Sequence, residues 1–240
     1  MSETQFEALV KKTITALGNP AAVAKFKAAT WKGKGVLYEG DQRSFLTAEW
    51  AIQLPFQNRV EGRIVQGDSV LHAISMMNAN AGWEIFNGET TAMDEKKLAE
   101  NQGQFYVNWV LPMTPLDDES FQLDYLGELL LDEHAVFGIN VRRKGPDFSF
   151  VELQQRNRGE VKLYFDQATG RLAKSEAQIV DEGQEILQET FYHHFQNIEG
   201  LIRPLDIEIW RDGKRFADLK LSDYQPRLFM LSSSIMAWRN

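Results

Sequence analysis

The sequence predicts one mainly β domain of the α+β class, in which an antiparallel up-and-down sheet packs against a few helices. Three observations support this prediction. Long stretches of the chain alternate apolar and polar residues, which is the two-residue period of a half-buried strand. Tight-turn dipeptides recur between these stretches. Helical periodicity is confined to the N-terminus and to one stretch near the middle of the chain.

The composition sets limits on the class of protein. The chain has 240 residues, a net charge of −8 and no cysteine. Its length suits a single domain over residues 1–240, and the negative charge opposes binding to nucleic acid. Without cysteine there are no disulfides and no thiolate metal sites. No apolar run reaches the length of about 18 residues that a membrane span needs, and the N-terminus lacks the layout of an export signal.

Two helices are predicted within residues 1–28. Gly18 suits the end of the first helix, and Asn19 with Pro20 suits the N-cap and first turn of the second. The first helix has a single apolar stripe, which we interpret as a core-facing surface. The stripe consists of Phe6, Leu9, Val10, Thr13, Ile14 and Leu17.

From Thr30 the period changes to two, and strand patterns continue to Tyr224. Turn dipeptides such as Asn87-Gly88 and Asp212-Gly213 predict tight hairpins, and we estimate about eleven strands. One strand has an apolar face formed by Leu46, Ala48, Trp50, Ile52 and Leu54. We therefore expect Trp50 to point into the concave interior of the sheet, and the strand before it to present Trp31, Gly33, Gly35 and Leu37 on one face.

A helical insertion is predicted at 94–113, where the strand pattern stops. Phe105 and Trp109 share a helical face, and Met113 follows at the start of a proline-rich loop. We expect this insertion to cover the apolar face of the sheet as a lid, although ordinary core packing explains the same residues. For the tail, 225–240, the sequence does not predict how it docks.

The polar stretch Asp166–Gly170, "DQATG", lies between two alternating runs. We interpret it as a hairpin turn, because Asp166 can accept backbone N–H groups and Gly170 can adopt a positive φ angle. A calcium loop would need several more oxygen donors at alternate positions, and Asp166 is the only acidic residue of the stretch.

The order of these elements also resembles a known family. In the C-terminal half, "LYFDQATGRLAKSEAQIV" is followed by a strand and then "EGLIRP", and "ALVKKTITALGNPAAVAKFKAATWKGKG" stands near the N-terminus. Over about residues 6–224 the chain resembles LolA/LolB/LppX-like proteins, the outer-membrane lipoprotein carrier superfamily. Within that superfamily it is most similar to an uncharacterised group of secreted planctomycete proteins.

The resemblance implies a strongly curved, incompletely closed antiparallel barrel with helices plugging its concave side. It also implies a cavity for acyl chains and a periplasmic or otherwise extracytoplasmic location. A cytoplasmic location remains the alternative, since this chain shows no signal layout. No catalytic residue comes with the resemblance.

Together these observations predict a monomer that binds or carries a lipid or the acyl chain of a lipoprotein, without catalysis and without a cofactor or metal. His193 and His194 point to opposite faces of a strand and cannot share one metal ion. Arg203 is expected on an apolar face, paired with Glu189 or holding a lipid head group. The alternative function is an envelope protein-interaction or sensor domain with a filled core. The candidate cavity and lid residues are Trp31, Leu46, Trp50, Ile52, Phe105, Trp109, Met113 and Arg203.

Overall fold

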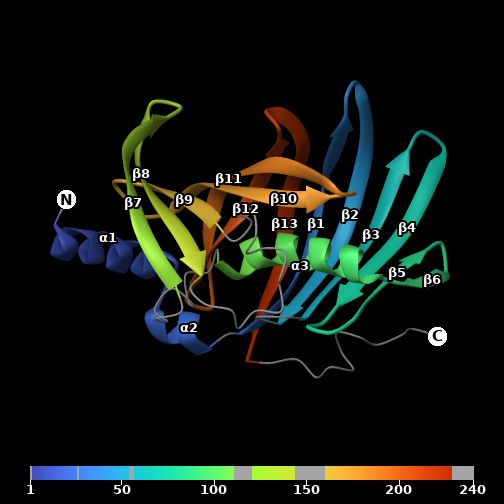
Figure 1. Cartoon of the computed structure of the whole chain (residues 1–240), viewed down its shortest axis with the longest axis horizontal. Coiled ribbons are helices and arrows are strands. Elements are labelled where there is room, and N and C mark those ends of the chain that lie inside the picture. Colours follow the sequence, from blue (N-terminus) through green and yellow to red (C-terminus); the bar gives the residue numbers. More distant parts are fainter. Residues whose placement is uncertain (1, 26, 54–56, 111–120, 144–159, 229–240) are drawn as a thin grey trace.

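The computed structural model describes residues 2–25, 27–53, 57–110, 121–143 and 160–228, which form three helices and one 13-stranded sheet (Figure 1). The helices are α1 (Glu3–Ala16), α2 (Pro20–Lys25) and α3 (Glu95–Val110). The strands of the N-terminal part are β1 (Ala28–Glu39), β2 (Gln42–Gln53), β3 (Gln57–Gln66), β4 (Ser69–Met77), β5 (Gly82–Phe86) and β6 (Glu89–Ala92). Those of the C-terminal part are β7 (Phe121–Leu131), β8 (His134–Arg143), β9 (Glu160–Asp166), β10 (Leu172–Asp181), β11 (Gln184–Ile198), β12 (Leu201–Arg211) and β13 (Lys214–Arg227).

All strand pairs are antiparallel, and the order across the sheet is β6-β5-β4-β3-β2-β1-β13-β12-β11-β10-β9-β8-β7. The first and last strands therefore pair in the middle of the sheet, while β6 and β7 form its edges. These two edges are not hydrogen-bonded to each other in the described ranges, so the sheet is curved but open. The predicted fold class is confirmed.

The estimate of about eleven strands was too low. The two shortest strands, β5 and β6, have five and four residues. The turn between them was expected from Asn87-Gly88, but the count from alternation still fell two short of the thirteen strands. At the N-terminus the helical region ends slightly earlier than predicted, since β1 already begins at Ala28.

Helix α3 follows β6 and precedes β7 in the chain, so it belongs to the connection between the two sheet edges. In Figure 1 it runs across the sheet, in front of the middle strands. The predicted helical insertion is thereby confirmed over Glu95–Val110, whereas 111–113 lie outside the described residues. A chain that passes from one edge to the other has to cross the face of the sheet.

The predicted hairpin turns are confirmed by backbone angles. Asn87 and Gly88 have φ values of 49° and 92°, and Asp212 and Gly213 have 47° and 72°. Two successive residues with positive φ match the twist of antiparallel strands, which is why asparagine, aspartate and glycine are favoured there.

The stretch Asp166–Gly170 forms a turn, as predicted. The Asp166 carboxylate accepts hydrogen bonds from the backbone N–H and the hydroxyl of Thr169, at 2.7 and 2.6 Å. Gly170 has a φ of +72°, and its N–H donates to the Asp166 carbonyl at 2.8 Å. These bonds use Asp166 to close the loop and account for the turn without a metal ion.

The C-terminal end of α1 is attached to the turn between β11 and β12. The N–H of Ile202 donates to the Leu17 carbonyl, and the N–H of Asn19 donates to the Gly200 carbonyl, both at 2.7 Å. A Cβ atom added to Gly18 would lie 2.1 Å from that same Gly200 oxygen, so only glycine permits this close approach. The helix is thus fixed against the sheet at its last turn.

Candidate ligand-binding site

One face of the sheet carries the helices, and we call it the helix-side face. Strand register links Ile52 to Asn58, Asn58 to Met77 and Met77 to Gly82, so these residues share a face. A Cβ atom on Gly82 would meet Met93 Sδ at 2.4 Å and Leu98 Cδ1 at 3.2 Å, so the start of α3 packs on this face. Because Ile52 lies on it, Leu46 and Trp50 in the same strand do so too. Leu54, predicted alongside them, lies outside the described residues.

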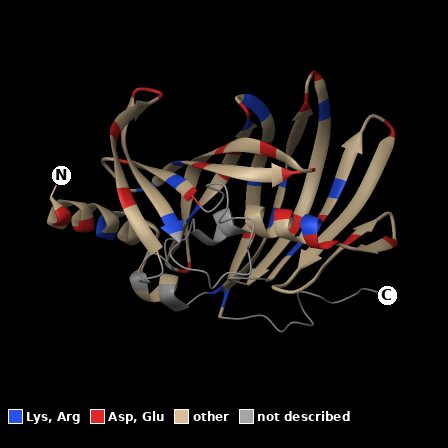
Figure 2. Ribbon diagram, viewed as in Figure 1, with Lys and Arg blue, Asp and Glu red and all other residues tan. Residues whose placement is uncertain are grey.

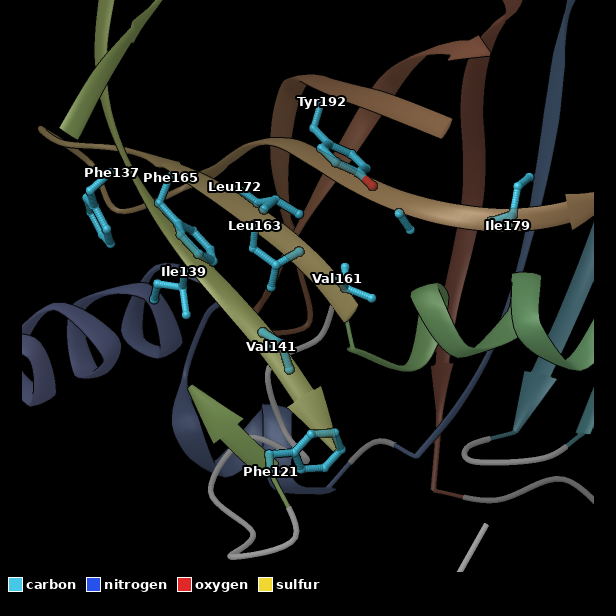
Figure 3. Packing of buried hydrophobic residues seen from close by; sticks show 11 residues of the cluster. Phe121, Phe137, Ile139, Val141, Val161, Leu163, Phe165, Leu172, Ile179 and Tyr192 are labelled. Atoms are coloured by element: carbon cyan, nitrogen blue, oxygen red, sulfur yellow. The ribbon is translucent and has the colours of Figure 1, made fainter. Parts of the chain in front are cut away.

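Helix α1 packs on the helix-side face against the core of the C-terminal strands, beside Ile139 (Figure 3). Tyr192 packs in this core, where its hydroxyl lies 2.8 Å from the Ser175 hydroxyl, and burial raises its pKa to about 12. The residues of this core are largely shielded from solvent, and the apolar stripe of α1 packs against them, as predicted. The buried members of the core are Phe121, Phe137, Ile139, Val141, Val161, Leu163, Phe165, Leu172, Ala177, Ile179 and Tyr192, and the stripe contributes Phe6, Leu9, Val10, Ile14 and Leu17.

The same face is less covered over the N-terminal strands. Leu46, Trp50 and Ile52 are only partly buried, although they point to the same side as the core just described. Between the rows of larger side chains runs a row of small ones, in which each residue is the register partner of the next. This row, which we call the small-residue row, consists of Ala73, Gly62, Ala48 and Gly33 on β4, β3, β2 and β1.

Three predicted site residues meet in a stack of side chains on the helix-side face. The rings of Trp31 and Trp50 lie parallel, with centroids 6.0 Å apart. On its other side Trp31 stacks on Tyr224 at 5.8 Å, and the guanidinium of Arg203 lies 5.6 Å from the Tyr224 ring. The order Trp50, Trp31, Tyr224, Arg203 crosses β2, β1, β13 and β12. We call these four residues the aromatic stack.

Tyr224 was not identified from the sequence. Asp223 has a φ of 52°, which is a break in the regular strand conformation, and the alternation that places Leu219 and Leu221 on the helix-side face shifts by one residue there. A strict two-residue alternation would have put Asp223 inward and Tyr224 outward. Asp223 instead approaches Lys32 on the outer face, at 3.6 Å.

The expected ion pair between Arg203 and Glu189 is wrong. Register places Glu189 opposite Trp210 but Arg203 opposite Gln196. The two positions are thus seven residues apart along β11, or about 23 Å at a rise of roughly 3.3 Å per residue. Arg203 instead donates from Nε to the Tyr224 hydroxyl at 3.1 Å and from Nη1 to the Ile202 carbonyl at 3.2 Å.

Glu189 belongs to a charge cluster on the outer face. Lys174 Nζ lies 2.6 Å from Glu189 and 2.7 Å from Glu176, and Tyr164 donates to Glu176 at 3.2 Å. Burial alone would raise the pKa of Glu176, but the hydrogen bond and charge of Lys174, helped by Lys162 and Tyr164, lower it below its usual value. The pKa of Tyr164 is raised, chiefly by burial and by the neighbouring Glu176.

Polar side chains of α3 attach it on two sides. Glu100 accepts the N–H of Gly183, in the turn between β10 and β11, at 3.0 Å, and Gln104 donates to the Val180 carbonyl at 3.2 Å. Gln102 donates to the Ala79 carbonyl, between β4 and β5, at 3.1 Å. The helix is therefore fastened by side chains to two separate loops.

The predicted lid residues are only partly placed. Phe105 is 4% exposed and so lies in a packed environment. The backbone of Trp109 belongs to α3, but its side chain is not among those described, and Met113 lies outside the described residues.

One hollow in the described structure is lined in part by Ile202, the chain neighbour of Arg203. It has a volume of about 600 Å³ between α1 and the Asp166–Gly170 turn, and it is open to solvent. Its lining is basic, since Lys11, Lys12 and Arg171 contribute to it. Elsewhere charges of both signs are spread over the hairpins and over α1 and α3 (Figure 2).

Neither a metal-binding cluster nor a membrane-spanning helix is found among the described residues. No group of three or more histidine, cysteine, aspartate or glutamate side chains in the described ranges is placed to hold a metal ion. The three described helices also include none with the length and apolar character of a membrane span.

Comparison with known proteins identifies the fold. A LolA superfamily protein of Nitrosomonas europaea matches with a TM-score of 0.59 and 14% identity, over 97% of each chain. A putative outer-membrane lipoprotein-sorting protein domain of Vibrio parahaemolyticus matches with a TM-score of 0.55 and 10% identity, over 95% of this chain and 97% of the other. A DUF1329 family protein of Desulfovibrio piger matches with a TM-score of 0.58 and 8% identity, over 96% and 97%.

The chain therefore has the LolA-like fold, as the resemblance implied. No protein-family model matches the sequence, and neither does any curated protein. The more specific similarity to a planctomycete group stays a prediction.

Proposed function

We propose that this protein binds a lipid, or the acyl part of a lipoprotein, between its sheet and helix α3, and that it does so without catalysis. One observation carries the proposal. A single apolar face is packed by α1 into a buried core over the C-terminal strands but is left partly exposed over the N-terminal strands, where Leu46, Trp50 and Ile52 lie. Burying that apolar surface against an acyl chain contributes about 0.8 kcal/mol per methylene.

The small-residue row gives this surface a suitable shape. Gly62 and Ala48 lie between larger neighbours, and a Cβ atom on Gly62 would meet Leu46 Cδ1 only at 3.5 Å. Gly33 and Ala48 are buried, Gly33 beneath the Trp50 ring, whereas Gly62 and Ala73 are only partly buried. A flexible chain can lie over Gly62 and Ala73 while the larger side chains contact it from both sides. In this proposal Trp31, Leu46, Trp50 and Ile52 contact the ligand.

Helix α3 acts as the cover of the site. It crosses the face between the two sheet edges, and Leu98 and Phe105 of the helix pack against neighbouring residues. Its polar attachments are hydrogen bonds made by Glu100, Gln102 and Gln104. Bonds of this kind contribute about 1 kcal/mol each to stability, so a ligand with a long chain can offset their loss. Phe105, Trp109 and Met113 are the proposed lid residues.

The proposed location is the periplasm or another extracytoplasmic compartment, and the proposed state is a monomer. The similar protein of Vibrio parahaemolyticus is described as lipoprotein-sorting, and the one of Nitrosomonas europaea as a LolA superfamily protein. At identities of 10% and 14% the similarity to these proteins shows a shared fold. Lipid binding by this protein is proposed by extension from that fold.

The direct test is lipid extraction and native mass spectrometry of the full chain, purified without detergent. We expect co-purified lipid in the native protein and much less in Gly62→Leu, which fills the small-residue row. Thr47→Leu is the matched control, because it adds the same side chain to the outward face of the neighbouring strand, where Thr47 is exposed. If native protein and both variants carry no lipid, and added fatty acid does not bind, lipid binding is ruled out as the function.

A second function, docking of a partner protein, has its own observation in favour. On the outer face Phe45 is 62% exposed and Val70 46% exposed, and register joins both to Val65 in one row. Exposed apolar rows of this kind occur at protein interfaces. Phe45→Ser should weaken capture of a partner without affecting lipid content, which separates this function from the first.

A further inference from the structure

We infer that the bound molecule is an anionic amphiphile, whose phosphate or carboxylate head group binds Arg203 while its acyl chain lies along the aromatic stack and the small-residue row. This inference rests on the proposed lipid-binding function and adds the chemical class of the ligand.

Arg203 is held in one place by its neighbours. Nε donates to the Tyr224 hydroxyl, Nη1 donates to the Ile202 carbonyl, and the guanidinium lies over the Tyr224 ring. Arg203 Nη2 makes no hydrogen bond with any residue that the structure describes. A guanidinium fixed in this way loses little further freedom when it binds a carboxylate or phosphate, which it can do through two parallel N–H groups.

The charge of Arg203 is not neutralised within the described ranges. Several arginines there have carboxylate partners within 4 Å, for example Arg215 with Asp218 at 2.7 Å and Arg211 with Asp181 at 2.8 Å. Arg203 has no such partner among the described residues, although the chain as a whole has a net charge of −8. On a partly buried apolar face an unpaired cation is costly, and a bound anion relieves that cost.

The apolar path starts next to the cation. Tyr224, Trp31 and Trp50 continue from Arg203 across β13, β1 and β2, and the partly buried Gly62 and Ala73 of the small-residue row follow on β3 and β4. From β12 to β3 there are four strand spacings, or about 19 Å at roughly 4.8 Å each. That is a suitable path for a long acyl chain, with the charged end at one side and apolar surface along the rest.

The experiment compares ligands that share one acyl chain but differ in head group. Delipidated full-length protein is titrated by calorimetry with palmitate, lysophosphatidic acid carrying a palmitoyl chain, and monopalmitoylglycerol, each below its aggregation concentration. We expect the two anionic ligands to bind roughly tenfold or more tightly than the neutral one, as a charge-assisted contact allows. Inorganic phosphate alone is expected to bind far more weakly than either.

Substitutions show which residue is responsible for the preference for anionic ligands. Arg203→Gln should abolish the preference, so that the anionic ligands bind no more tightly than the neutral one, while Arg203→Lys should keep part of the preference. Arg215→Gln is a matched control, since Arg215 also lies over a tyrosine, Tyr38 at 5.6 Å, but is neutralised. Arg171→Gln tests the basic hollow beside α1 as the alternative anion site.

The outcomes separate this inference from the function on which it rests. If all three lipids bind equally, the head-group assignment is overturned while lipid binding stands. If Arg171→Gln rather than Arg203→Gln removes the preference, the anion site lies in the hollow and the inference is wrong. Binding of free phosphate as tight as that of the lipids would contradict the role of the acyl chain. If no lipid binds, the proposed function itself fails.

Discussion

Trp31 and Trp50 are register partners on the neighbouring strands β1 and β2. Their indole rings are stacked, with an angle of 9° between the ring planes. The Trp50 ring extends over Gly33, where a Cβ atom would lie 2.8 Å from Trp50 Cζ3. Glycine at position 33 is therefore what leaves room for this ring. A side chain at that position would tilt the ring and disturb both partners of the stack.

We predict that Trp50→Ala lowers the free energy of unfolding by about 2–4 kcal/mol, because a partly buried indole loses its contacts with Trp31 and Gly33. Denaturant unfolding measures the loss. Phe45→Ala is the control on the same strand, since this 62% exposed side chain points to the other face, and it should change stability by less than about 0.5 kcal/mol. An unchanged midpoint for Trp50→Ala would contradict the placement of Trp50.

A second prediction concerns the Asp166–Gly170 turn. Gly170→Val should destabilise the protein by about 2 kcal/mol or more, because φ is +72° and the new Cβ would lie 3.0 Å from Lys12 Cγ and 3.1 Å from the Lys12 carbonyl oxygen. Gly213→Val is a close control, since Gly213 has the same φ of +72° with open space around it. The difference between the two variants measures the contact with α1.

We also expect that adding calcium or EDTA leaves the melting temperature of the native protein unchanged. The Asp166 carboxylate is already occupied by Thr169, so the turn does not need an ion. A rise of several degrees with calcium would show that the turn binds metal.

The third prediction uses the charge cluster on the outer face. Lys174→Met should cost about 1–3 kcal/mol at neutral pH, because it leaves Glu176 and Glu189 close together without their shared cation. Lys162→Met is the control, since Lys162 is more exposed and lies 3.6 Å from Glu176, and it should cost no more than about 0.5 kcal/mol.

The cost of Lys174→Met should depend on pH in a defined direction. The pKa of Glu176 in the folded protein lies below its usual value of 4.5, so its contribution to stability is present above pH 4.5 and is lost as the pH falls through the folded pKa. The difference in unfolding free energy between native protein and Lys174→Met should therefore narrow below pH 4.5. A difference that stays constant from pH 7 to pH 3 would show that packing, rather than charge, is lost.

The fourth prediction concerns the attachment of α3. Glu100→Ala removes the acceptor for the Gly183 N–H and should speed hydrogen exchange at Gly183 and in α3, with a loss of about 1 kcal/mol in global stability. Glu95→Ala, in the exposed first turn of the same helix, should leave exchange at Gly183 as it was. If α3 covers the site, Glu100→Ala should also release bound lipid faster than the native protein. Equal release rates for the two proteins would contradict the role of α3 as a lid.

Local structure was predictable where a few neighbouring residues determine it. Asn87-Gly88 and Asp212-Gly213 form the expected turns because their positive φ angles suit these residue types. The stripe of α1 packs as expected because one apolar helix face has to be buried. Trp31 and Trp50 lie on the face expected from alternation, since neither strand is interrupted near them.

Pairing between distant strands was not predictable in the same way. Arg203 and Glu189 were matched because each was expected on the apolar face of its strand, but which pairs meet depends on the register of β11 with β12, and alternation does not encode register. The strand irregularity at Asp223 hid Tyr224, because a single residue with positive φ reverses the inward and outward positions after it. The aromatic stack depends on both features and so emerged only from the structure.

The pairing of β1 with β13 has a consequence for how the protein is made. Ala28 pairs with Arg227 and Leu37 with Ala217, so the seam in the middle of the sheet joins segments from the two ends of the described chain. During synthesis β1 leaves the ribosome long before its partner exists, and the hairpins on either side can form only as separate units. Contacts between such distant segments slow folding into the range of milliseconds to seconds or longer. The helix-side face around Trp31 is therefore completed last, and until then its apolar residues are a natural target for a chaperone.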